Sequence, residues 1–491
     1  MFTNRGWIMK RAALSPNRTA LVDVHTGDSW TYAMLQQRIV HWASYFKRQG
    51  YKKGERIAIV APNSSELFAI LFACEMTGLL YVPLNWRLSR FELVTLLTDC
   101  SPSILLFHEQ FKAVIDEMRF PNSVPLISID AVDYQDFKVE QLIGEDPWMM
   151  IYTGGTTGVS KGVVLSADAV NWNALNTIVS WGLTEEDITI NYMPLFHTGG
   201  MNALSIPILM AGGTVIVGNS FDAEEALSAT DTYAATISLF VPTMYQSMIH
   251  TPYFRQSSFP TMKVFLSGGA PCPQTIYHAF HEKGLKFKEG YGLTEAGPNN
   301  FYIRSGEACL KIGSVGKSML FNSIKVLNEE MKLCGIDEVG ELFIKGPHVF
   351  SYYWRNPTAT AETLVEGWLR TGDLAKCDSD GYTYIVGRKK DTIITGGENV
   401  YPQEVEQCLV LFDGVKEVAV VGVKDDLWGE IIVAFIIMAD GYPFDCDDIT
   451  MHCKKFLGSY KIPKKVIELK ELPKTHVGKI NKKILQEMVG K

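Results

Sequence analysis

Short apolar runs alternate with helical patterns along the first part of the chain, and this alternation restricts the fold more than any other feature. Residues 56–63 (RIAIVAPN) predict a buried strand, residues 65–78 (SELFAILFACEMTG) an amphipathic helix, and residues 79–85 (LLYVPLN) the next strand. Residues 212–218 and 262–271 repeat the strand pattern. Such alternation predicts layered α/β sheets that are largely parallel, with ligands bound at the carboxyl ends of the strands.

The chain length and a change in composition predict two domains. With 491 residues, the chain is too long for a single hydrophobic core. The residues beyond Arg388 predict a glycine loop, a helix that starts after Pro402, and two strands (EVAVVGV and EIIVAFIIM), which suit a small α+β domain. We therefore predict a large domain over residues 1–388 and a small one over residues 389–491, with a hinge in the charged run RKKD.

Charge and cysteine content limit the classes of protein. Forty-six Lys and Arg residues against 54 Asp and Glu residues give a net charge of −8, which argues against a nucleic-acid or anionic-membrane surface. The nine cysteines lack CxxC pairs and zinc-ligand spacing, so we expect reduced thiols in a cytoplasmic protein. The N-terminus shows no secretory signal, and Glu75 interrupts the most apolar segment, so no membrane span is expected. The sequence is compatible with a homodimer.

The stretch YTGGTTGVSKG, residues 152–162, predicts a phosphate site. Glycines let backbone amides point into a concave loop, where they bind phosphate oxygens. Hydroxyl donors add to the amides, and Lys161 adds positive charge; the hydroxyl-bearing residues are Thr153, Thr156, Thr157 and Ser160. A triphosphate is therefore the leading ligand, and a surface turn without a ligand is the alternative.

Two neighbouring motifs compete for this loop. A P-loop NTPase needs glycine directly before the lysine, and Ser160 occupies that place, so this motif fails. Residues 158–162 (GVSKG) do match the G-x-S-x-G nucleophile elbow, so a serine acyl hydrolase that uses Ser160 is an alternative from a different class. The hydroxyl-rich run before Ser160 has no purpose in an elbow.

Five further stretches follow the loop in a fixed order. They are PLFHTGG (194–200), YGLTEAG (291–297), GWLRTGD (367–373), GRKKDTIITGGENVYPQEVE (387–406) and PKTHVGKINK (473–482). Together with the loop they resemble the ordered motifs of the adenylate-forming (ANL) superfamily, in its acyl-CoA synthetase branch. This resemblance implies a large N-terminal domain of layered α/β sheets with a β-barrel-like part, a mobile C-terminal lid, and the use of ATP, Mg²⁺ and CoA.

The resemblance implies a site for ATP. The residues that match the family's nucleotide site are Thr153, Gly154, Gly155, Thr156, Thr157, Gly158, Lys161, Gly269, Ala270, Tyr291, Gly292, Thr294, Asp373, Arg388 and Lys479. Tyr291 would stack on adenine, Asp373 would bind the ribose, Arg388 the ribose or α-phosphate, and Thr294 the α-phosphate. Glu295, with Thr153, would hold Mg²⁺, which prefers oxygen ligands. Gly154 and Ser160 depart from a serine and a proline that are common in the family.

Four of these residues have ordinary structural alternatives. Tyr291 could be a core aromatic, Glu295 a charge at a helix N-terminus, and Asp373 and Arg388 a surface ion pair.

The same resemblance implies the catalytic and acyl-binding residues. Lys479 would stabilise the charge that develops when a carboxylate attacks the α-phosphate. His197 would border the carboxylate site, with a structural histidine as its alternative. The acyl pocket would be lined by His197, Met201, Val241, Met244, Gly268 and Pro298, and the catalytic set would be Lys479, His197, Thr294 and Glu295. Lys390 matches the hinge, and the CoA tunnel would be shaped by Gly396, Gly397 and Glu398.

The predicted function is an ATP-dependent acid–CoA ligase that forms acyl-AMP and pyrophosphate, then acyl-CoA and AMP. The mostly apolar pocket residues and the flexible methionines favour a medium- or long-chain fatty acid. An aromatic acid–CoA ligase, or an acyl-AMP ligase that loads a carrier protein, is the alternative.

Overall fold

The computed structural model describes residues 6–126, 144–153, 160–474 and 480–489. The chain forms two compact units, which are described separately. The larger unit consists of Met1–Gly269, Ile276–Ile324 and Ile344–Leu369, and the smaller unit of Ala270–Thr275, Lys325–Phe343 and Arg370–Lys491. A domain boundary between residues 388 and 389 stays a prediction.

The first sheet of the larger unit has seven strands in the order β18-β8-β7-β4-β3-β5-β6. The strands are β3 (Arg56–Val60), β4 (Leu80–Pro83), β5 (Ile104–Phe107), β6 (Ser123–Pro125), β7 (Pro147–Thr153), β8 (Lys161–Ser166) and β18 (Tyr352–Tyr353). Strands β3 to β7 pair in parallel, whereas β8 pairs antiparallel with both β7 and β18. The predicted strands at residues 56–63 and 79–85 are thus confirmed as β3 and β4.

The second sheet has seven strands in the order β13-β12-β11-β9-β10-β1-β2. The strands are β1 (Thr19–Asp23), β2 (Ser29–Thr31), β9 (Ile188–Asn191), β10 (Thr214–Val217), β11 (Ile237–Phe240), β12 (Val264–Ser267) and β13 (Phe287–Glu289). All pair in parallel except β2, which lies antiparallel on the edge. The carboxyl ends of β9, β11, β12 and β13 therefore lie along one edge of this sheet.

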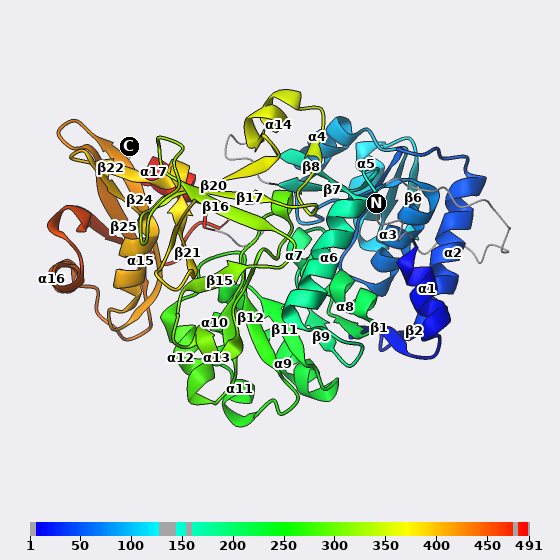
Figure 1. Ribbon diagram of the computed structural model, residues 1–491, viewed down its shortest axis with the longest axis horizontal. Helices are drawn as coiled ribbons and strands as arrows, with labels where there is room; N and C mark the ends of the chain where they lie inside the picture. The colour runs from blue at the N-terminus through cyan, green and yellow to red at the C-terminus, as the bar shows by residue number, and fades with distance from the viewer. Residues whose placement is uncertain (1–5, 127–143, 154–159, 475–479, 490–491) are drawn as a thin grey trace. The chain divides into compact units, whose positions relative to one another are not determined.

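A layer of helices lies between the two sheets (Figure 1). Helix α3 contacts β4 of the first sheet and β1 of the second, and α6 and α8 contact each other and opposite sheets. The helices before residue 364 are α1 (Trp7–Leu14), α2 (Tyr32–Arg48), α3 (Ser65–Thr77), α4 (Arg90–Cys100), α5 (Lys112–Met118), α6 (Ala167–Trp181), α7 (Thr198–Asn202), α8 (Ser205–Ala211), α9 (Ala223–Thr232), α10 (Pro242–Ile249), α11 (Pro252–Gln256), α12 (Gln274–Glu282), α13 (Ser305–Ala308) and α14 (Pro357–Thr363).

The prediction of an amphipathic helix at residues 65–78 is correct in type but wrong in its amphipathic character. Helix α3 buries all of its side chains except those of Glu66 and Met76, because sheets or helices cover nearly its whole circumference. A helix that is apolar all round is typical of such a central layer.

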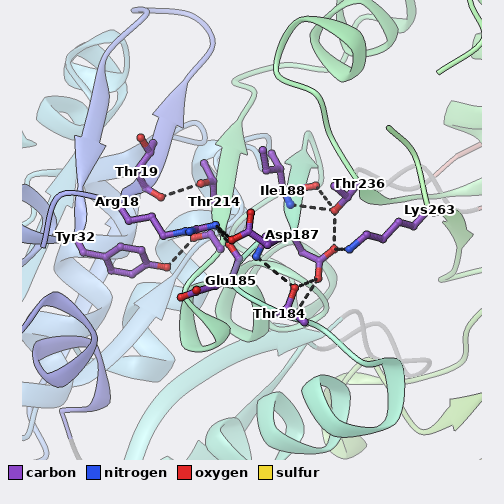
Figure 2. Close-up of polar contacts among 12 residues, drawn as sticks. Arg18, Thr19, Tyr32, Thr184, Glu185, Asp187, Ile188, Thr214, Thr236 and Lys263 are labelled. Carbon is purple, nitrogen blue, oxygen red and sulfur yellow. Dashed lines mark hydrogen bonds and ion pairs between the residues drawn. The ribbon is translucent and has the colours of Figure 1, made fainter. Parts of the chain in front are cut away.

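A buried carboxylate braces the amino ends of the second sheet (Figure 2). Asp187, which precedes β9, is buried and accepts hydrogen bonds from Lys263 Nζ at 2.7 Å and Thr236 Oγ1 at 2.8 Å. The backbone amide of Thr184 donates to the other carboxylate oxygen at 2.8 Å. Burial acts to raise the pKa of Asp187, but these bonds offset it and lower the pKa overall. The starts of β9, β11 and β12 are thereby tied together.

Further strands lie between residues 300 and 390. They are β14 (Phe301–Tyr302), β15 (Ser314–Ser318), β16 (Ser323–Leu327), β17 (Gly340–Lys345), β19 (Leu364–Val365), β20 (Trp368–Cys377) and β21 (Thr383–Arg388). Within the larger unit β14 pairs antiparallel with β15, and within the smaller unit β20 pairs antiparallel with β21. A β-barrel-like part stays a prediction.

The C-terminal part of the smaller unit is a sheet covered by helices on both faces. Its strands are β22 (Ile393–Thr395), β23 (Glu398–Val400), β24 (Val415–Asp425), β25 (Gly429–Met438) and β26 (Lys465–Glu468), and its helices are α15 (Pro402–Val410), α16 (Cys446–Phe456) and α17 (Lys482–Val489). Val418 and Val420 of β24 pack with residues of α15 and α16, whereas Ala419 and Val421 pack with Leu485 of α17. The predicted α+β architecture is therefore confirmed.

Two observations concern membrane spans and disulfides in the described part of the chain. No helix there is long and apolar enough to cross a bilayer. All nine cysteines lie within the described ranges, and none of them forms a disulfide bond.

Candidate active site

The β7–β8 hairpin places Thr153 opposite Lys161 at the mouth of the glycine-rich loop. The two residues are register partners in the antiparallel pair, and Thr153 Oγ1 donates to the carbonyl of Lys161 at 3.4 Å. The loop residues between them, Gly154, Gly155, Thr156, Thr157 and Gly158, lie outside the described residues. The hairpin nonetheless fixes where the loop begins and ends.

This hairpin is incompatible with a nucleophile elbow at Ser160. An elbow needs the serine on a sharp turn between a strand and a following helix. Ser160 instead directly precedes β8, which continues as a strand to Ser166. The serine hydrolase alternative therefore lacks the backbone geometry that its motif requires.

Tyr353 joins Lys161 to Glu295. It lies on β18, opposite Val163 of β8. The ammonium of Lys161 lies over the Tyr353 ring, 4.8 Å from its centroid, and the Tyr353 hydroxyl donates to Glu295 Oε1 at 2.7 Å. The carbonyl of Glu295 also accepts from the amide of Phe350 at 2.8 Å. Two residues predicted from separate motifs, the lysine of the loop and the carboxylate, thus share one buried tyrosine.

Residues 290–300, here called the 290–300 loop, connect β13 to β14 and carry Tyr291, Thr294 and Glu295. Tyr291 is only partly buried and meets Phe301 edge-on, with ring centroids 5.8 Å apart. It is therefore not the core aromatic that was the alternative reading. A Cβ atom at Gly292 would lie 2.2 Å from the carbonyl of Pro298, so only glycine fits there.

Asn300 holds the turn that follows Glu295. Its side-chain amide donates to the carbonyls of Ala296 at 3.1 Å and Gly297 at 3.0 Å. Its Oδ1 lies 2.8 Å from Nε2 of His348 and has no hydrogen of its own, so His348 must be the donor. Burial lowers the pKa of His348 to about 4, which keeps the ring neutral at physiological pH. Thr294 and Glu295 occupy a single 3₁₀ turn (η3, Thr294–Ala296) that these bonds hold in place.

The predicted acyl-binding residues follow the carboxyl ends of the parallel strands in the second sheet. His197 follows β9, Val241 follows β11, and Gly268 follows β12. Gly269 has a φ of +82°, and a Cβ atom there would lie 3.5 Å from Val241 Cγ1. Met201 is fully buried in α7, whereas Met244 and Pro298 are partly buried. Ala270, which follows Gly269, is exposed. This is the edge of a parallel sheet at which ligands usually bind.

Asp373 and Arg388, predicted from separate motifs, meet in the smaller unit. They are register partners on β20 and β21, and Arg388 Nε lies 2.7 Å from Asp373 Oδ1. The carboxylate is buried while the guanidinium is partly exposed. Thr371 Oγ1 accepts from the amide of Asp373 at 3.0 Å. The alternative interpretation, a surface ion pair, is thus only half correct, because the Asp373 carboxylate is buried.

The predicted hinge residue follows directly after this strand pair. Lys390 is exposed in the 3₁₀ turn η4 (Lys389–Asp391). The neighbouring Lys389 donates to Glu341 Oε2 at 2.9 Å, and Arg370 donates to the same oxygen at 3.1 Å. Burial acts to raise the pKa of Glu341, but the two cations offset it and lower the pKa overall.

The predicted CoA loop is a two-residue turn between β22 and β23. Gly396 and Gly397 have φ values of +60° and +86°, as a tight hairpin turn of this kind requires. The amide of Gly396 donates to the carbonyl of Trp428 at 2.9 Å, and Glu398 is exposed.

Lys479 lies outside the described residues, so its role stays a prediction. Three residues were not predicted from sequence: Tyr353, Asn300 and His348. No family motif contains them, although the pair Asn299-Asn300 directly after YGLTEAGP is an unusual polar run before a strand.

Comparisons with known proteins agree with the motif order. Residues 8–354 match the family described as AMP-binding enzyme, and residues 404–479 match the AMP-binding enzyme C-terminal domain. Feruloyl-CoA synthase from an Amycolatopsis species is 36% identical over 99% of this chain and 98% of that protein. Indoleacetate–CoA ligase from Aromatoleum aromaticum is 34% identical over the same shares of the two chains. Long-chain-fatty-acid–CoA ligase FadD13 from Mycobacterium tuberculosis is 33% identical over 99% of this chain and 98% of that protein.

A solved structure shows the same fold. The o-succinylbenzoate CoA synthetase (MenE) of Bacillus subtilis, in complex with its acyl-adenylate intermediate, aligns with a TM-score of 0.89 and 29% identity over 99% of this chain and 98% of that one. The sequence matches extend over nearly the whole chain, which therefore belongs to the AMP-binding enzymes of the adenylate-forming superfamily and is an AMP-forming acid–CoA ligase.

Proposed function

We propose that this ligase activates an aromatic or arylalkyl monocarboxylic acid. The acid displaces pyrophosphate from ATP to give acyl-AMP, and the thiol of CoA then displaces AMP to give the thioester. The observation that carries the choice of acid is that the two most similar relatives named above act on feruloyl and indoleacetate groups. The fatty-acid substrate favoured by the sequence becomes the second candidate.

The packing behind the predicted acyl pocket supports an aryl or arylalkyl acid over a long alkyl chain. Tyr245, one residue after Met244, is fully buried and its hydroxyl donates to the carbonyl of Leu266 at 2.8 Å. Its ring meets those of Phe240, Phe280 and Phe287 edge-on, with centroids 5.1 to 5.5 Å apart. An alkyl chain that ran inward past Met244 would have to displace these rings. Close-packed aromatic side chains resist such displacement.

The glycines at the end of β12 supply a surface that suits a flat ring. Gly268 and Gly269 carry no side chains, so the ligand would meet bare backbone on that side. Val241 Cγ1 lies 3.5 Å from a Cβ position at Gly269, so the valine side chain packs close to this backbone. A planar aryl group can lie flat against such bare backbone beside an apolar side chain.

The nucleotide roles follow the family pattern. The glycine-rich loop and Lys161 bind the β- and γ-phosphates, Thr294 the α-phosphate, and Tyr291 the adenine. Asp373 binds the ribose, and Arg388 can serve the ribose or the α-phosphate. The burial of Asp373 and its ion pair support this role, because a fixed carboxylate is a good acceptor for ribose hydroxyls.

Glu295 and Thr153 fit a magnesium ion that is held mainly by ATP. Carboxylate and hydroxyl oxygens are suitable ligands, and Mg²⁺ usually takes only one or two protein carboxylates beside the phosphates. The described residues contain no cluster of three or more acidic, histidine or cysteine side chains that could hold a metal. When bound, the ion would neutralise phosphate charge. The Tyr353 hydroxyl fixes Glu295 Oε1 and leaves the second carboxylate oxygen for the ion.

The smaller unit serves the second step. A pocket that has released pyrophosphate must admit a bulky thiol, and a lid that turns about Lys390 allows both events. The Gly396-Gly397 turn and Glu398 then border the pantetheine tunnel. The exposed position of Lys390 and the narrow turn support these roles.

The fatty-acid alternative has one specific observation in its favour. The long-chain-fatty-acid relative is 33% identical to this chain, only a few per cent below the aromatic relatives.

The test is pyrophosphate release across a panel of acids, with and without CoA. The panel contains cinnamic, hydroxycinnamic and arylacetic acids and straight-chain acids of increasing length. We expect the highest kcat/KM for an aryl acid and CoA-dependent formation of AMP. Higher kcat/KM for decanoic or longer acids would select the fatty-acid ligase instead, and ATP-independent ester hydrolysis would contradict both.

A further inference from the structure

Lys288 is a buried lysine at the mouth of the 290–300 loop. It lies in the middle of β13, with 5% of its surface exposed. Both of its neighbours on the strand contact Tyr277. The ring of Phe287 meets the Tyr277 ring edge-on, and the Tyr277 hydroxyl donates to Glu289 Oε1 at 2.7 Å. Because side chains alternate along a strand, Lys288 points to the opposite face.

The ammonium of Lys288 is held by one carbonyl and two aromatic rings. Its Nζ donates to the carbonyl of Ile303 at 3.3 Å. It lies 4.6 Å from the ring centroid of Tyr302 and 5.0 Å from that of Trp181, the last residue of α6. No carboxylate among the described residues forms an ion pair with it, so the rings supply most of the compensation for its charge.

Burying an ammonium without a carboxylate costs stability. Burial lowers the pKa of Lys288 to about 8, from an ordinary value near 10.5. The charged groups on the elements packed against β13 are Arg304 and Glu307 at α13 and Lys317 on β15. None of these charges contributes to the lowered pKa, which burial alone explains. An apolar side chain of similar length would avoid this cost, so stability alone does not account for the lysine.

The carbonyl that Lys288 binds lies at the far end of the loop. Lys288 is two residues before Gly290, and Ile303 is three residues after Asn300. Its ammonium therefore closes the mouth of the segment that carries Tyr291, Thr294 and Glu295. The backbone amide of Asn300 also donates to the carbonyl of Tyr291 at 3.2 Å, and Lys288 adds a side-chain hydrogen bond outside this one, between β13 and the residue that follows β14.

We propose that Lys288 is a positioning residue for adenylation, which holds the entry and exit of the 290–300 loop together so that Tyr291 and Thr294 meet the nucleotide. The inference rests on the proposed nucleotide site. Lys288 does not touch substrate in this role. The buried charge lowers stability, and the fixed loop geometry increases activity.

Three variants test this, with ATP–pyrophosphate exchange and thermal melting as readouts. Lys288→Met removes the donor and the charge at nearly constant volume. We expect a melting temperature equal to or above that of the wild type, together with a rise of about tenfold in the KM for ATP and a smaller change in the KM for the acid. Lys288→Arg keeps a cation and should retain most of the activity. Tyr291→Ala is the control for the nucleotide site itself.

The pH profile separates positioning from a merely structural role. In the wild type, exchange activity should decline as the ammonium is lost around pH 8, while Lys288→Arg should keep its activity because arginine stays charged. If Lys288→Met shows wild-type exchange kinetics while Tyr291→Ala is defective, the positioning role of Lys288 is overturned and the nucleotide site is not. Normal kinetics in Tyr291→Ala would instead overturn the nucleotide site. If Lys288→Met does not fold, an alkaline decline that is identical in the wild type and Lys288→Arg overturns it.

Discussion

At the scale of single residues, the site is organised by a tyrosine that no motif contains. The Tyr353 ring lies beneath the ammonium of Lys161, and its hydroxyl binds Glu295. The proposed phosphate and magnesium roles of Lys161 and Glu295 would need the two groups at a fixed separation. Tyr353 sets that separation from one buried side chain.

The first prediction concerns the Tyr353 hydroxyl. Tyr353→Phe keeps the ring under Lys161 but frees the carboxylate of Glu295, so the KM for magnesium–ATP should rise about three- to tenfold with little change in fold. Tyr352→Phe, on the same strand, is the matched control and should behave as the wild type. Steady-state pyrophosphate release at varied magnesium measures the effect. An unchanged KM in Tyr353→Phe would show that Glu295 needs no such support.

The second prediction concerns Lys479. Without its ammonium, the repulsion between carboxylate and α-phosphate is no longer offset, so Lys479→Ala should lose acyl-adenylate formation by about a hundredfold or more. Thioester formation from supplied acyl-adenylate should stay largely intact. Single-turnover assays of each half-reaction measure the two rates, with Lys483→Ala as the control on the neighbouring helix. Equal loss in both half-reactions would remove Lys479 from its assigned role.

At the scale of elements, the sequence predicted strands well and long-range contacts poorly. The apolar runs at residues 56–63 and 79–85 became β3 and β4, because short apolar runs bounded by turn residues are typical of buried strands. Helix α3 was misjudged as amphipathic, although its sequence is apolar on nearly all sides, which is the pattern expected of a helix covered on all sides. Tyr353 could not be predicted as a partner of Glu295, because the contact spans 58 residues and depends on β18 pairing with β8.

The third prediction concerns the Gly396-Gly397 turn. Gly396→Ala places a Cβ atom 3.1 Å from the Trp428 ring at a φ of +60°, so the turn is strained and either the turn or the ring must shift. We expect the thioester step to slow several-fold while acyl-adenylate formation is unchanged. Gly441→Ala has a similar positive φ without any neighbour within 4 Å, so it controls for backbone strain. Stopped-flow measurement of AMP release with saturating CoA follows the step. A slower adenylation step in Gly396→Ala would contradict the assignment.

At the scale of the whole molecule, the two edges of the second sheet have different tasks. The amino edge is held by the buried Asp187 and its bonds to Lys263, Thr236 and Thr184, while the carboxyl edge carries the loops of the candidate site. A rigid sheet anchored at one edge allows its loops at the other edge to keep accurate positions.

The fourth prediction concerns stability and pH. Because the pKa of Asp187 is lowered on folding, its contribution is present above its unfolded pKa near 4 and is lost as the pH falls through the folded value. Asp187→Asn should destabilise the larger unit by about 1–3 kcal/mol at pH 7, and the difference from the wild type should shrink below about pH 4. Scanning calorimetry at both pH values measures this, with the exposed Asp426→Asn as control. A constant difference across that range would assign the effect to packing rather than to charge.

The β7–β8 pairing also bears on how this enzyme can diverge. Lys161 pairs with Thr153 in the β7–β8 register, so strand pairing sets its position and the residues between the strands do not. Substitutions within the turn, such as glycine at 154 and serine at 160, can accumulate without moving the ammonium. A single-residue deletion inside β8 would instead turn that side chain to the other face of the sheet. Mutational scans that measure the yield of folded protein should thus tolerate exchanges between the two strands and reject one-residue gaps in β8.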